Sequence, residues 1–138
     1  MSTVDEFRKS LPNDFNGENL NIVQWLGTPR RSNNLLQITY KNNPSILYVK
    51  GSNSSPGFWG LTKNQLDRLN NSQAPWFVVL LLKSKDSGYF LSSKEVNAKI
   101  QDGTFELSKD GDHKVNEISD LNSNMAFREI KNLLECIV

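Results

Sequence analysis

The feature that most constrains the fold is a continuous run of apolar residues from Trp76 to Leu82, rich in β-branched, aliphatic and aromatic side chains. Seven residues are about a third of the length that a membrane-spanning helix needs, so the run does not predict a membrane partner. A strand without a polar position is typical of a strand buried on both of its faces. We therefore expect one α/β domain over residues 1–138, with a central mixed sheet of about four to five strands and flanking helices.

The other expected elements come from periodicity and turn residues. The segment Leu35 to Lys41 alternates apolar and polar residues, and the turn Asn42-Asn43-Pro44 leads into Ile46 to Lys50, which predicts an antiparallel hairpin. The segment Leu20 to Leu26 fits a strand or a short helix. Helices are expected over Thr3–Leu11, from Thr62, from the capping box of Ser92 and Glu95, and over Met125–Ile137. A strand over Tyr89–Leu91 is expected to pair with the apolar run. The remaining segments are expected to form a loop over Gly51–Gly60 and a loose hairpin over Gly103–Lys114.

Charge is distributed unevenly along the chain. No acidic residue occurs between Glu18 and Asp67, whereas the formal net charge of the whole chain is +1. The cations of this acid-free stretch are Arg30, Arg31, Lys41, Lys50 and Lys63, a sum of +5. A stretch of one sign favours binding of an anion, and nucleic acid is the most common large one. Chemistry that needs paired carboxylates cannot be built within this stretch.

The residues after Lys50 favour the same interpretation. They form a glycine- and serine-rich segment that includes Ser52, Phe58 and Trp59, and a helix is expected to begin near Lys63. Backbone amides in such a loop and at a helix N-terminus attract phosphate, and aromatic faces stack on bases. The alternative is that Phe58 and Trp59 pack against the end of the core and that the lysines are only solvated. The sequence leaves both open.

The scarcity of cysteine and histidine excludes other classes of site. Cys136 cannot form an intrachain disulfide, and with His113 it cannot provide the four ligands of a structural zinc site, so no metal is expected. His113 lies among polar residues and is expected in a surface turn. The first six residues contain neither a basic start nor an apolar segment, so the expected location is the cytoplasm.

Several of these segments together resemble the PD-(D/E)XK nuclease superfamily. Tyr48-Val49-Lys50 resembles the strand that ends in Glu-x-Lys, Gln65 resembles the glutamine of the following helix, and the run from Trp76 resembles the buried strand. Gly88 to Val96 is similar to the closing strand and helix, so that the similarity covers roughly residues 33 to 100. The resemblance implies a restriction-endonuclease-like αβββαβ core.

The chain departs from that family at the metal-binding positions. The family holds Mg²⁺ with an Asp on one strand and a Glu two residues before the lysine. Tyr48 stands at the Glu position, and the region where the Asp is expected offers only the amides Asn33, Asn34 and Gln37. The resemblance therefore implies a degenerate active site on a scaffold that holds nucleic acid without cutting it.

Three functions follow as hypotheses. The preferred one is a non-catalytic nucleic-acid-binding domain, with DNA as the expected nucleic acid, serving as an accessory or regulatory subunit in DNA processing or a mobile element. Its expected contacts are Arg30, Arg31, Lys41, Lys50, Ser52, Phe58, Trp59 and Lys63. The second is a Mg²⁺-dependent DNA endonuclease that uses Lys50 and Gln65 with a relocated acid, Glu18. The third is a protein-interaction or inhibitor module, or a homo-oligomer in which the acidic segment Asp102–Asp120 meets the basic stretch.

Overall fold

The computed structural model describes residues 3–25 and 34–137. Its elements are, in chain order, α1 (Thr3–Ser10), β1 (Asp14–Phe15), β2 (Glu18–Gln24), β3 (Leu35–Tyr40), β4 (Asn43–Ser52), β5 (Phe58–Thr62), α2 (Lys63–Asn71), β6 (Trp76–Leu82), β7 (Gly88–Ser92), α3 (Ser93–Gln101), β8 (Asp112–Asn116), α4 (Glu117–Asp120), the 3₁₀ turn η1 (Ser123–Met125), β9 (Ala126–Phe127) and α5 (Ile130–Ile137). None of the described helices has the length and apolar character to span a membrane.

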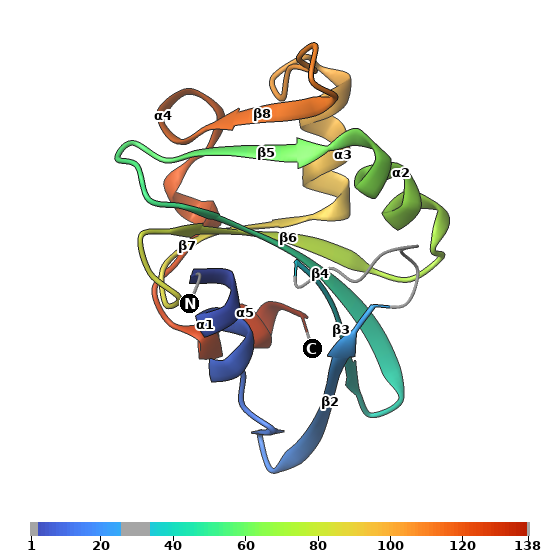
Figure 1. Ribbon diagram of the computed structural model, residues 1–138. Helices are drawn as coiled ribbons and strands as arrows, with labels where there is room; N and C mark the ends of the chain where they lie inside the picture. Colours follow the sequence, from blue (N-terminus) through green and yellow to red (C-terminus); the bar gives the residue numbers. More distant parts are fainter. Residues whose placement is uncertain (1–2, 26–33, 138) are drawn as a thin grey trace.

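A large mixed sheet forms the centre of the molecule (Figure 1). Its strand order is β1-β2-β3-β4-β6-β7-β9, where β1 and β9 are two-residue strands at the edges. Among the described strands of this sheet, only β4 and β6 are parallel, and the other neighbours are antiparallel. With the two-residue β1 and with β5, which belongs to a separate small sheet, set aside, the order α1, β2, β3, β4, α2, β6 is the αβββαβ order of a restriction-endonuclease-like core, so the predicted fold class is confirmed.

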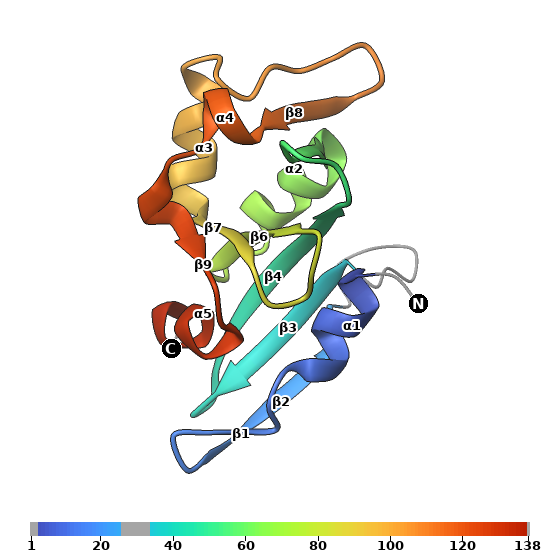
Figure 2. The ribbon, with the colours of Figure 1, turned by 90° about the vertical axis from the view of Figure 1, so that its left-hand side faces the viewer.

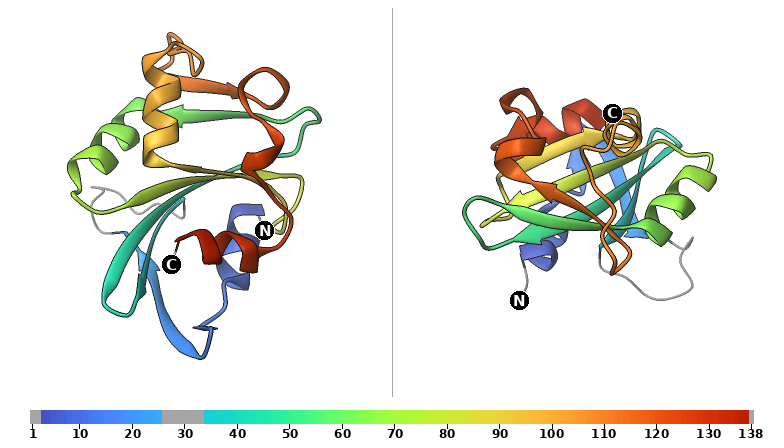
Figure 3. Two further views of the ribbon diagram at one scale, coloured as in Figure 1. Left: turned by 180° about the vertical axis from the view of Figure 1, so that it is seen from behind. Right: turned by 90° about the horizontal axis from the view of Figure 1, so that it is seen from above.

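Each face of the sheet has its own apolar core. On one face, Phe7 of α1, Leu11 just after it, and Leu133 and Leu134 of α5 pack against side chains of β4 and β6. On the other face, α2, α3 and a separate two-stranded sheet of β5 and β8 form the cover. Figures 2 and 3 show these two layers on opposite sides of the large sheet. This arrangement explains why β6 contains no polar residue.

Local sequence signals are sufficient for several elements. The hairpin of β3 and β4 forms with Tyr40 opposite Asn43, as the turn residues predict. The capping box is present: the Ser92 side chain accepts from Glu95 N at 3.2 Å, and Glu95 Oε1 accepts from Ser92 N at 2.9 Å. β7 pairs with β6 as expected. The ambiguous segment from Leu20 is part of strand β2, because it pairs with β3.

Other expectations are wrong because distant pairing decides them. The expected loop over Gly51–Gly60 includes the start of β5, which pairs with β8 some fifty residues later. The expected helix over Met125–Ile137 is helical only in α5, since β9 pairs with β7 instead. His113 is not in a surface turn: it is buried, with Nδ1 bonded to the carbonyl oxygen of Phe105 at 2.8 Å.

Candidate nucleic-acid interface

Tyr48, at the position where the resemblance implies a Glu, is fully enclosed by the core. Its side chain lies on the face of β4 that packs against β5 and α2, and Leu35 of β3 is directly opposite in register. The hydroxyl oxygen accepts a hydrogen bond from Thr62 N at 3.1 Å, which ties β4 to the start of α2. The position therefore holds a neutral structural group and no metal ligand.

Lys50 follows two residues later on the same face of β4 and is partly buried. It is level with Leu80 of β6, near the carboxyl ends of the two parallel strands. Within the described residues, Lys50 forms no ion pair. Ligands of open α/β sheets commonly bind beyond the carboxyl ends of parallel strands, so Lys50 offers an uncompensated positive charge at a favourable place.

A second cation at this end of the sheet was not predicted from the sequence. Lys83 directly follows β6 and is exposed, and its backbone N donates to the carbonyl oxygen of Ser52 at 2.8 Å. This bond holds the ends of β4 and β6 side by side. A lysine immediately after a buried strand was the available signal, but Lys83 lies outside the acid-free stretch and was overlooked for that reason.

The start of α2 brings two of the predicted residues close to β4. Lys63 follows Thr62, the residue bonded to the Tyr48 hydroxyl, and forms an i,i+4 ion pair with Asp67 at 2.8 Å. Both side chains are about half exposed, so the pair contributes little to stability. Gln65 has its Oε1 buried and without a hydrogen-bond partner among the described residues. Buried acceptors are nearly always bonded, so a water or ligand donor is expected there.

The two aromatic residues have separate roles. Trp59 is 2% exposed, its Nε1 donates to the carbonyl oxygen of Leu81 at 3.0 Å, and its ring packs edge-on against Tyr89. It belongs to the core and has no free face on which a base could stack. Phe58 is 47% exposed, and Lys114 Nζ lies 5.9 Å from its ring centroid. Because Lys114 pairs with Asp110 and Asp112, the surface around Phe58 carries acids that repel phosphate.

Ser52 is occupied by its own loop. It is 8% exposed, and its Oγ accepts from the backbone N atoms of Ser54 and Phe58, each at 3.3 Å. A further bond joins it to the Ser54 hydroxyl at 3.0 Å. These contacts order the loop between β4 and β5, so Ser52 positions the backbone and is not free to bind a ligand.

The remaining predicted residues do not join this end of the sheet. Lys41 lies in the β3–β4 turn, and Lys50 is seven residues past Asn43 on β4, which separates the two by about 23 Å along the strand. Glu18 lies near the same turn, because Leu20 pairs with Tyr40. The structure therefore does not bring Glu18 to Lys50. Arg30 and Arg31 lie outside the described residues, and their expected contacts with phosphate stay a prediction.

Over residues 3–25 and 34–137, no group of three or more His, Cys, Asp or Glu side chains is arranged to hold a metal ion. A carboxylate with two short hydrogen bonds is that of Glu117, whose partner Tyr89 lies on β7, level with Leu80 of β6 and with Lys50 of β4. Glu117 Oε1 accepts from Gly57 N at 2.7 Å, and its Oε2 accepts from the Tyr89 hydroxyl at 2.6 Å.

Titration of Glu117 and Tyr89 is coupled through that bond. The hydrogen bond from Tyr89, helped by that from Gly57, lowers the pKa of Glu117. The same bond, together with burial and the negative charge of Glu117, raises the pKa of Tyr89 to about 12. The contact links the loop after β4, strand β7 and helix α4. Sequence reasoning missed it because its three members are far apart in the chain.

No protein-family model matches the chain, and no curated protein matches it either. Among solved structures, the chain is similar to Hjc from Archaeoglobus fulgidus, a Holliday junction resolvase from an archaeal hyperthermophile. The identity is 14%, the match covers 83% of this chain and 85% of that chain, and the TM-score is 0.44. This is a distant likeness in the arrangement of elements.

Proposed function

We propose that this chain binds a nucleic-acid backbone, that of DNA, without cleaving it, and that the binding site lies at the carboxyl ends of β4 and β6. The observation that carries the proposal is the placement of Lys50, a cation with no ion-pair partner among the described residues, two positions from the buried neutral Tyr48. A phosphate gains from the positive charge there, whereas no carboxylate beside Lys50 on β4 is available to hold Mg²⁺.

Two further cations support this site. Lys83 extends from the end of β6, and Lys63 is the first residue of α2, where the positive end of the helix dipole favours an anion, although the Lys63 backbone N–H itself donates to the carbonyl oxygen of Gly111 at 3.0 Å. Lys41 belongs to the same acid-free stretch but lies at the far end of β4. It therefore serves as a matched control, since its charge is the same and its position is not.

The test measures binding of a fluorescent 20-base-pair duplex by anisotropy over a range of salt concentrations. Lys50→Gln should weaken binding and reduce the slope of log K against log salt by about 0.9, the contribution of one phosphate contact. Lys41→Gln should leave both unchanged. Equal effects of the two variants, or affinity that does not depend on salt, would reject the proposal.

A parallel assay separates binding from cleavage. Supercoiled DNA incubated with the protein and Mg²⁺ or Mn²⁺ should remain intact. Cleavage that disappears in Lys50→Gln would instead support the endonuclease alternative, with the acid supplied by a residue other than Glu18.

A further inference from the structure

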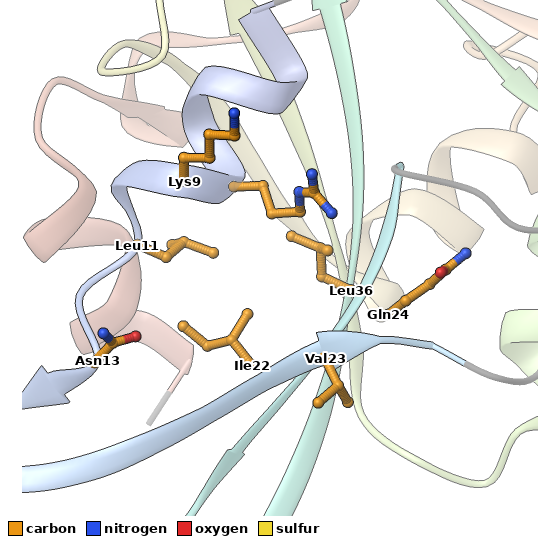
Figure 4. Close-up of a pocket in the computed structure, with 8 residues that line it drawn as sticks. Lys9, Leu11, Asn13, Ile22, Val23, Gln24 and Leu36 are labelled. Carbon is orange, nitrogen blue, oxygen red and sulfur yellow. The ribbon is translucent and has the colours of Figure 1, made fainter.

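A groove between α1 and β2 lies on the face of the large sheet opposite to the face that carries Tyr48 and Lys50. It has a volume of about 320 Å³, and its lining includes two cations, Arg8 and Lys9, and no acidic residue. Figure 4 shows Leu11, Ile22 and Leu36 converging inside it, with Lys9 above them on the helix. Neither cation forms an ion pair with another described residue. The groove thus combines an apolar floor with a positively charged rim.

The groove borders an unpaired edge of the large sheet. β2 pairs with β3 from Leu20 to Gln24, but on its other side β1 pairs only with its first two residues, Glu18 and Asn19. Leu20 N donates outward to the carbonyl oxygen of Asn13 at 2.9 Å, and Trp25 N donates inward to that of Leu35 at 3.0 Å. Because outward and inward groups alternate along an antiparallel strand, the N–H and C=O groups of Ile22 and Gln24 point outward. No described residue bonds to them.

We propose that this edge docks an extended segment of a partner protein, which adds to the sheet as a further strand beside β2. The outward groups of Ile22 and Gln24 would pair with its backbone, as in other cases of strand addition. Side chains of an added strand alternate between the two faces, so residues two positions apart both enter the groove. One of them is apolar and packs against Leu11 and Leu36, and the other is acidic and meets Arg8.

Charge selects this occupant over two others. A second copy of the chain paired edge to edge across a two-fold axis would bring the same cations, Arg8 and Lys9, toward their counterparts. The phosphates of a nucleic acid would neutralise the cations of the groove, but they would not pair with the alternating N–H and C=O groups of the strand edge. Val23 lies on the opposite face of β2 and is 44% exposed, so an added strand would also cover part of its side chain.

The experiment follows amide hydrogen exchange at Ile22 and Gln24 by NMR. The probe is a pool of acetylated, amidated hexapeptides with Val at the second position, Glu at the fourth, and varied residues elsewhere. A second pool carries Lys in place of Glu. The acidic pool should slow exchange at these two amides about tenfold or more at saturation, and the basic pool should not.

Two variants make the test specific. Gln24→Pro removes an outward N–H, which edge strands tolerate, and should abolish protection at Ile22, whereas Gln24→Val keeps the N–H and should preserve it. Arg8→Glu should reverse the preference between the two pools. This variant tests the proposal even if Gln24→Pro does not fold. The proposal is overturned if neither pool slows exchange, if both do equally, or if Gln24→Pro and Gln24→Val behave alike. Protection that grows with protein concentration alone, or that a DNA duplex produces, would equally overturn it.

Discussion

Replacing Glu117 by Gln tests the two hydrogen bonds that connect helix α4 with strand β7 and with the loop after β4. The carboxylate accepts two short hydrogen bonds, 2.7 Å from Gly57 N and 2.6 Å from the Tyr89 hydroxyl. A glutamine offers one neutral oxygen and an NH₂ group, so one bond weakens and the other loses its acceptor. Hydrogen bonds to charged groups contribute about 1.5–3 kcal/mol each, and partial solvent exposure reduces this. We expect a loss of about 2 kcal/mol in the free energy of unfolding.

For a chain of this length, a loss of that size corresponds to a decrease in Tm of roughly 7 °C. Circular dichroism during heating at pH 7 measures it. Glu106→Gln is the matched control, because Glu106 is an exposed acid whose side chain forms no bond to a described residue. An equal Tm for the two variants would refute the assigned role of Glu117.

The same contact predicts a dependence on pH at both ends of the range. The pKa of Glu117 is lowered on folding, so its contribution to stability is present above its ordinary value and is lost as pH falls through the folded pKa. The pKa of Tyr89 is raised from 10.0 to about 12, so its contribution is present below pH 10 and is lost as pH rises toward 12. The stability difference between the native chain and Glu117→Gln should therefore shrink in both directions. In ultraviolet titration, Tyr89 should ionise nearer pH 10 in the variant, and an unchanged titration would contradict the coupling.

Two further substitutions test the packing around the site. Tyr48→Phe leaves Thr62 N without its acceptor and should lower the free energy of unfolding by about 1–2 kcal/mol in urea titration, whereas Tyr40→Phe, whose hydroxyl bonds to no described residue, should change it little. Equal losses would show that the Tyr48 bond is unimportant. Gly88→Ala should cost about 3 kcal/mol, because a Cβ there would overlap the carbonyl oxygen of Leu80 in the adjacent strand. Gly103→Ala, with open space around it but a φ of +86°, should cost only about 1 kcal/mol, and a larger loss there than at Gly88 would refute the steric argument.

The positions of the candidate residues in the fold were predicted correctly where neighbours in sequence are also neighbours in space. Lys50 lies at the end of its strand, and the helix after Thr62 begins beside it, as expected. The sequence left open whether Trp59 stacks on a base or packs in the core. The tertiary structure shows that it packs in the core, where its indole N–H donates to the carbonyl oxygen of Leu81. The tertiary structure also decided the position of Lys41, which belongs to the same acid-free stretch as Lys50 but lies at the other end of β4.

The sequence by itself determined the buried strand β6, the β3–β4 hairpin and the capped helix α3, since apolar periodicity, turn residues and a capping box act over a few residues. The tertiary structure alone decided the pairing of β5 with β8, the short β9 in place of a longer helix, and the burial of His113. All three have the same physical reason, since each depends on hydrogen bonds or packing with a segment distant in the chain. Such contacts override weak local preferences and leave no periodic signal in the sequence.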